Sequence, residues 1–189
     1  MNAVSQPQRY LINVEQYHKM GAAGVFPEGT RVELIEGELL SMAPIGTPHI
    51  WAVAALTREI IESPLGRHVF LLPQLPVVLS DISEPQPDIA LARLPAEKYR
   101  KAKATPEDIV LLIEVSDSTL AFDRQRKMQL YARHGIPEYW ILNVQDRQLE
   151  VHRAPENGSY ASVRVVPAGT PVSVLAFPDL PLDWSVALD

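Results

Sequence analysis

Short apolar runs of the kind that form β-strands recur along most of the chain. Residues 31–42 predict two short strands that turn at Glu36-Gly37. Asn157-Gly158, a dipeptide suited to positive φ, predicts a hairpin between residues 147–154 and 160–167. The other expected strands are 68–72, 75–80, 87–93, 109–115 and 138–144.

Two longer stretches have the spacing of amphipathic helices. Residues 47–63 predict one helix, with Thr47 as its cap and Pro48 at its first position, where a missing N–H costs nothing. Residues 119–134 predict a second, ended by Gly135 and Pro137. The central order of helix, three strands, helix and strand predicts an α/β (α+β) fold with a mixed β-sheet flanked by helices.

Length and composition narrow the class of protein. A chain of 189 residues predicts a single domain over residues 1–189, and the absence of cysteine excludes disulfides, thiolate catalysis and cysteine-bound zinc. No apolar run approaches the roughly 20 residues that span a bilayer, so we expect no membrane partner. The first 20 residues lack the apolar core of a signal peptide, which favours a cytoplasmic location.

The net charge of −6 argues against a protein that coats DNA but is compatible with a metal-dependent nuclease, whose site must be acidic. One basic cluster lies within eleven residues and is either a solvated loop or a contact for nucleic acid. Its members are Arg93, Lys98, Arg100, Lys101 and Lys103.

Two charged residues interrupt apolar patterns. Glu114 directly follows the run 110–113, inside an expected buried strand. On a helical wheel Lys127 falls in the same arc as Leu130 and Tyr131, so it points inward, where an isolated ammonium group is costly. Its candidate partners are Asp123 and Glu114, and a salt bridge between helix and strand is one interpretation.

Asp88 supports a second interpretation. It follows Pro87 at the start of an expected strand, so Asp88 and Glu114 both lie at strand margins of one sheet, near Lys127. Two carboxylates that converge beside a lysine suit a hard divalent cation, Mg²⁺ or Mn²⁺. Such a cation can activate water and neutralise charge on a phosphate, while the lysine orients the water or stabilises that charge.

These residues also carry a family resemblance. "PD" at 87–88 and "EVS" at 114–116 resemble the motif of the PD-(D/E)XK nucleases, and motifs spread over residues 31–152 resemble the Uma-two group of restriction endonucleases. The resemblance implies a restriction-endonuclease-like core with additional N-terminal and C-terminal hairpins, and magnesium-dependent hydrolysis of DNA. Ser116 stands where the superfamily usually has lysine. In the resembled group that lysine is on the next helix, and Lys127 matches its place.

The same resemblance adds weaker candidates. Gln86 resembles a glutamine that could orient the attacking water, and Glu38 lies in a similar "GEL" context, although it is otherwise an ordinary strand carboxylate. His49, near a helix N-terminus, is either a site residue or a partly exposed first-turn histidine. We expect Ser116 and Thr119 to cap the second helix.

A different class of function stays open. The chain could be a catalytically inactive or regulatory protein that keeps the nuclease scaffold and binds a protein or nucleic-acid partner. For the nuclease, cleavage of both DNA strands favours a homodimer.

Overall fold

The computed structural model describes residues 8–42 and 46–189, and these divide into two compact units. The first unit contains the residues up to 42 together with 78–85, and the second contains 46–77 and 86–189. The single domain expected over residues 1–189 stays a prediction.

The described residues of the first unit form one helix and one hairpin. Helix α1 (Val14–Ala22) begins at Asn13, whose side chain accepts a hydrogen bond from the Gln16 N–H in a capping box. Strands β1 (Val32–Ile35) and β2 (Glu38–Ser41) are antiparallel, as predicted. The turn requires Gly37, which has φ 78°, and an added Cβ there would lie 2.6 Å from Leu11 Cβ.

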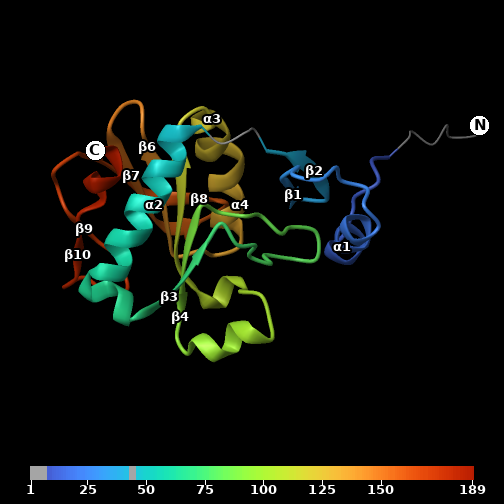
Figure 1. The fold of residues 1–189 in the computed structure, drawn as a ribbon, viewed down its shortest axis with the longest axis horizontal. Coiled ribbons are helices and arrows are strands. Elements are labelled where there is room, and N and C mark those ends of the chain that lie inside the picture. The colour runs from blue at the N-terminus through green and yellow to red at the C-terminus, as the bar shows by residue number, and fades with distance from the viewer. Residues whose placement is uncertain (1–7, 43–45) are drawn as a thin grey trace, which may run out of the picture. The chain divides into compact units, whose positions relative to one another are not determined.

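The second unit is built on a six-stranded sheet of order β3-β4-β5-β6-β7-β8 (Figure 1). Neighbouring strands are antiparallel except for β5 and β6, which are parallel, so the sheet is mixed as predicted. The strands are β3 (Val69–Pro73), β4 (Ile89–Arg93), β5 (Ile109–Ser116), β6 (Glu138–Asn143), β7 (Gln148–Glu156) and β8 (Ser159–Pro167). The β7–β8 turn lies at Asn157-Gly158, as predicted, and both residues have positive φ.

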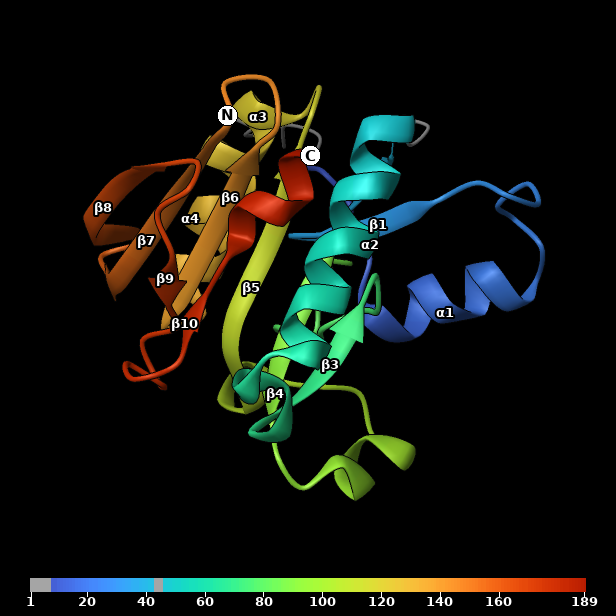
Figure 2. The ribbon, with the colours of Figure 1, turned by 60° about the vertical axis from the view of Figure 1, so that its left-hand side comes forward.

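Helical segments cover both faces of this sheet (Figure 2). Helix α2 (Thr47–Glu62) lies on one face with the C-terminal tail. The crossover that parallel strands need lies on the other face and contains α3 (Leu120–Phe122), a π-helical turn (Asp123–Lys127) and α4 (Met128–Arg133). The shorter elements are the 3₁₀ turns Pro64–Arg67, Ala96–Arg100, Pro106–Asp108 and Trp184–Leu188 and the strand pair β9 (Val172–Ser173) and β10 (Pro181–Leu182).

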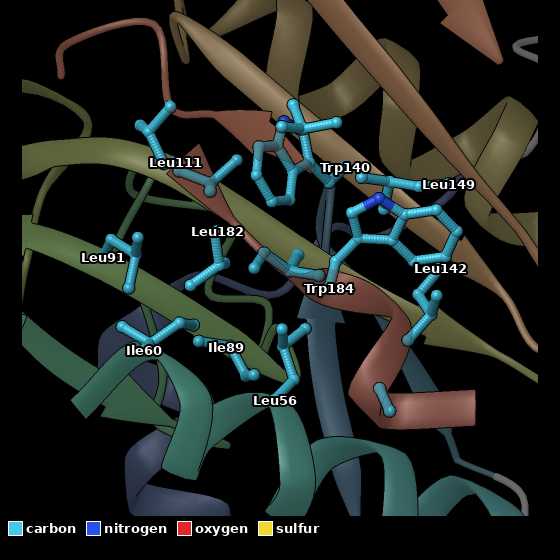
Figure 3. Packing of buried hydrophobic residues seen from close by; sticks show 14 of the residues in the cluster. Leu56, Ile60, Ile89, Leu91, Leu111, Trp140, Leu142, Leu149, Leu182 and Trp184 are labelled. Atoms are coloured by element: carbon cyan, nitrogen blue, oxygen red, sulfur yellow. The ribbon is translucent and has the colours of Figure 1, made fainter. Parts of the chain in front are cut away.

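The main apolar core fills the space between the sheet, α2 and the tail (Figure 3). Leu56, Ile60, Trp140 and Trp184 have no exposed surface, and Trp184 Nε1 donates to the Thr170 carbonyl at 2.8 Å. In the tail, Leu182 and Trp184 belong to this core, and Phe177 and Leu180 pack against it. None of the helices in the described residues is long and apolar enough to cross a bilayer.

Two expectations about elements outside the crossover were wrong. Residues 75–80 form no strand and contribute only isolated bridges at Val77 and Ser80, because Gln74 has φ 50° and Pro76 has no N–H to donate. Thr47 is the first residue of α2 and not its cap; Gly46 occupies that position, without a side-chain hydrogen bond.

Candidate active site

The pairing of β4 with β5 brings Asp88 and Glu114 together. Ile89 lies opposite Ile113 in this antiparallel pair, and one more step of the same register places Asp88 opposite Glu114. Directly opposed residues share one face of a sheet, with Cβ atoms about 4.5–5.5 Å apart. Both residues are buried, with 6% and 3% of their surface exposed.

Asp88 is fixed by two donors. Its Oδ2 accepts hydrogen bonds from the Val115 backbone N–H at 2.9 Å and pairs with Nε2 of His49 at 2.9 Å. Burial alone would raise the pKa of the Asp88 carboxyl. The two donors and the charges of His49 and Lys127 outweigh burial and lower this pKa overall, so Asp88 is ionised near neutral pH.

Glu114 lies on the face of β5 opposite the main core and meets the crossover. Its Oε1 accepts hydrogen bonds from Lys127 Nζ at 2.9 Å and from the Tyr131 hydroxyl at 2.7 Å. The Lys127 side chain is only 2% exposed, which agrees with the inward orientation read from the helical wheel. The salt bridge between helix and strand therefore exists, and it joins two of the proposed site residues.

The crossover differs from the continuous helix predicted at residues 119–134, because residues 123–127 form a π-helical turn. Asp123 and Lys127 are the two buried residues of this turn. Turns of this type are rare in helices and are frequent at functional sites.

Asp123 binds two hydroxyl groups at the start of the crossover. Its Oδ2 accepts from Ser116 Oγ at 2.7 Å and from Thr119 Oγ1 at 2.6 Å, so the prediction that these hydroxyls cap the helix was wrong. Burial raises the pKa of the Asp123 carboxyl, and the charge of Lys127 offsets this only in part. Lys127 thus acts on Asp123 through its charge and on Glu114 through a hydrogen bond.

The weaker candidates occupy different places. His49 lies in the first turn of α2, and its Nδ1 is buried without a hydrogen-bond partner among the described residues. Gln86 is partly buried, two residues before Asp88. Glu38 belongs to the first unit, where its Oε1 accepts a hydrogen bond from Arg9 at 2.7 Å. The structure groups His49 with Asp88, while the roles of Gln86 and Glu38 stay predictions.

Sequence reasoning missed two groups at the site. The first is the Tyr131 hydroxyl, which donates to Glu114. The sequence contained a signal for it, because Tyr131 follows Lys127 by four residues and therefore lies on the same face of the helix. The second is the Val115 N–H on Asp88, a backbone donor for which no residue type gives a signal.

The basic cluster leaves the sheet at the end of β4 opposite to Asp88. Arg93 ends this strand, and five steps of about 3.4 Å place it roughly 17 Å from Asp88 along β4. Lys98 forms an ion pair with Asp108, and Arg93 Nε donates to the Glu107 carbonyl at 3.2 Å. The loop then turns back, because Ala104 forms an isolated bridge with Val77.

Comparisons with known proteins define the family. A family model described as "Uma2: Putative restriction endonuclease" matches residues 14–185, and the chain belongs to this family, which supports a nuclease. A solved structure described as a putative nuclease belonging to DUF820, from Anabaena variabilis ATCC 29413, has the same fold, with a TM-score of 0.67 at 18% identity. The match covers 94% of this chain and 97% of that one. None of the curated proteins matches the chain.

Proposed function

We propose that this chain is a metal-dependent endonuclease that hydrolyses phosphodiester bonds of DNA. One observation carries the proposal: the register of β4 and β5 places Asp88, which directly precedes β4, opposite Glu114, and the buried ammonium group of Lys127 binds Glu114. A nuclease needs this combination of acceptors for a cation and a positive charge for the phosphate. The family assignment supports the same class of reaction.

The donor atoms present suit Mg²⁺ or Mn²⁺. Both hydrogen bonds to Asp88 go to Oδ2, and no donor among the described residues contacts Oδ1. The described residues contain no cluster of three histidine or acidic side chains arranged for a metal. Mg²⁺ is commonly held by one or two carboxylates and several waters, so Asp88 and Glu114 would be its protein ligands. When bound, it would supply an activated water and neutralise phosphate charge.

The surrounding side chains would orient the reacting groups. Tyr131 and Lys127 hold the Glu114 carboxylate at one oxygen, and the Val115 N–H with His49 holds Asp88. In this proposal the Lys127 ammonium orients the attacking water or stabilises charge that develops on the phosphate. Gln86 would help to orient the water. Cleavage of both strands would favour a second copy of the chain.

Metal titration combined with a nicking assay tests this proposal. Calorimetric titration with Mn²⁺ should give one site in the wild type, and the protein should nick supercoiled plasmid with Mg²⁺ or Mn²⁺. Asp88→Asn should lose both properties, with cleavage reduced by about 100-fold or more. Asp179→Asn is the matched control, because Asp179 is exposed, and it should behave as wild type. Metal binding that survives Asp88→Asn would contradict the proposed ligand.

A scaffold function is the second candidate, and one observation favours it. The Lys127–Glu114 pair with the Tyr131 hydroxyl neutralises and fixes Glu114 without a metal. A regulatory protein that binds a partner through its surface would need these contacts only to stabilise its fold. Absence of Mn²⁺ binding in the wild-type protein, with the fold intact, would favour this function over the nuclease.

A further inference from the structure

A pocket of about 380 Å³ lies beside the edge strand β3, outside the group of residues around Asp88. One wall is apolar and comes from Leu72, Leu75 and Pro76. The other wall comes from the basic loop and contains Tyr99, Lys101 and Lys103. The pocket therefore combines an apolar surface, an aromatic ring and cations.

Tyr99 is held in place before any ligand arrives. Its ring stacks on Phe70 with centroids 5.1 Å apart and an interplanar angle of 2°. Its hydroxyl donates to the Arg93 carbonyl at 2.7 Å. A fixed aromatic ring loses little conformational entropy on binding, and it offers a surface for another planar group.

The cations of the loop divide into two groups. Lys98 is paired with Asp108, and Arg93 Nε bonds the Glu107 carbonyl, so these two anchor the loop. The side chains of Arg100 and Lys101 are exposed and form no ion pair or hydrogen bond with the residues that the structure describes. In a chain of net charge −6, an unpaired cation at the rim of a pocket favours an anionic ligand there.

We infer that this pocket binds one unpaired nucleotide of a DNA strand, with its base against Tyr99 and the apolar wall and its phosphate at Lys101. A planar base suits the aromatic and apolar lining, and the phosphate complements the lysine. A paired base is stacked inside the duplex and could not enter, so the ligand must be single-stranded at this point. The choice of DNA rests on the proposed function, but binding here requires no metal.

Strand binding in metal-free buffer tests the inference. Fluorescence anisotropy should show that a short oligo-dT strand binds more tightly than an equally long abasic strand, by roughly 5-fold or more, because each stacked base contributes about 1–3 kcal/mol. A blunt duplex of the same length should bind more weakly than oligo-dT. Tyr99→Leu should remove the preference for the base-bearing strand.

Two charge-reversing substitutions distinguish a contact at this pocket from a general effect of net charge on DNA binding. Lys101→Glu should weaken oligo-dT binding several-fold and reduce the slope of log affinity against log salt by about 0.7 for the lost phosphate contact. Arg164→Glu makes the same change in net charge at an exposed position of β8 and should leave the slope unchanged. Leu75→Glu, at a residue 46% exposed, tests the apolar wall without altering Tyr99 and should also weaken binding.

Three results would overturn the inference. The first is an equal loss of oligo-dT affinity in Lys101→Glu and Arg164→Glu, and the second is equal affinity of the wild type for oligo-dT and for the abasic strand. The third is full competition by free thymidine monophosphate, which would assign the pocket to a mononucleotide. Failure of the proposed nuclease is distinguishable from these, because Asp88→Asn should lose cleavage and keep metal-free binding of oligo-dT. Binding without cleavage in the wild type would contradict the nuclease alone.

Discussion

Two buried carboxylates of the same sheet, Glu138 and Asp88, are satisfied in different ways. Glu138 has no exposed surface and receives donors on both oxygens. Its Oε1 accepts from Trp140 Nε1 at 2.8 Å and from Arg153 Nε at 2.7 Å, and its Oε2 accepts from the Leu175 N–H at 2.6 Å. This carboxylate therefore ties β6, β7 and the tail together.

Asp88 is nearly as buried, but its donors are concentrated on one oxygen. His49 and the Val115 N–H both contact Oδ2, and the described residues supply no donor to Oδ1. The two carboxylates therefore differ in how donors are distributed over their oxygens, and Oδ1 of Asp88 is the atom that we propose as a ligand of the cation.

The largest effect on stability should come from Glu138→Ala. The change leaves Arg153 and the Leu175 N–H without their partner, and loss of one member of a buried pair costs about 3–5 kcal/mol. We expect the low end of this range, since the Arg153 side chain is 28% exposed. Urea unfolding measures the loss.

Two comparisons check this interpretation of Glu138. Glu62→Ala removes an exposed ion pair with Arg58 on α2 and should leave the unfolding midpoint almost unchanged. The nicking activity of Glu138→Ala, per folded molecule, should equal that of the wild type. A selective loss of activity with normal stability would place Glu138 among the functional groups.

The next effect is on catalysis. Lys127→Ala should reduce metal-dependent DNA cleavage by about 100-fold or more, the scale expected when a group that stabilises transition-state charge is removed. In metal-free buffer the variant should also unfold more easily, because Glu114 loses its buried counter-charge. Mn²⁺ should restore most of this stability, since it would neutralise the same carboxylate.

The comparison of unfolding midpoints with and without Mn²⁺ separates the two interpretations of Lys127. Lys19→Ala, which removes an exposed pair with Glu15, is the control and should change neither stability nor cleavage. An equal drop in the Lys127→Ala midpoint in both buffers would assign Lys127 to the structural salt bridge alone.

The sequence predicted most of the sheet because strand and burial signals coincide there. Residues 109–113 are continuously apolar and form the first part of strand β5, and Asn157-Gly158 marks the β7–β8 turn. The wrong strand at 75–80 had apolar residues too, but a turn at Gln74 redirected the chain. A local pattern does not show such a change of direction.

The site was predicted in part for a similar reason. The apolar neighbours of Glu114 and Lys127 made both charges visible in the sequence. The alignment of Asp88 with Glu114 depends on the register in which β4 pairs with β5, which the residue pattern of the two strands does not show. The π-helical turn at 123–127 was not predicted either, because its residues suit an ordinary helix.

The smallest effect should appear in the pH dependence of stability, where Asp88 and Asp123 have opposite signs. The pKa of folded Asp88 lies below its ordinary value of 3.8, so between these two values the unfolded chain binds more protons. Its stabilising contribution is therefore complete above about pH 3.8 and is lost as the pH falls through the folded pKa. The pKa of folded Asp123 lies above 3.8, so the native state binds more protons in that window, and stability falls as the pH rises through it.

Urea unfolding of wild type, Asp88→Asn and Asp123→Asn in metal-free buffers measures these two slopes. Below pH 3.8 the wild type loses the stabilising contribution of Asp88 as the pH falls. Asp88→Asn has no such contribution to lose, so its free energy of unfolding should fall less over this range. Asp123→Asn should lose the decline above pH 3.8, so its stability relative to wild type should improve as the pH rises. Each unit of difference in pKa corresponds to about 1.4 kcal/mol. For each variant, the quantity to compare is the difference in unfolding free energy from the wild type as a function of pH. The contrast between Asp88 and Asp123 would be contradicted if these two differences changed with pH in the same direction.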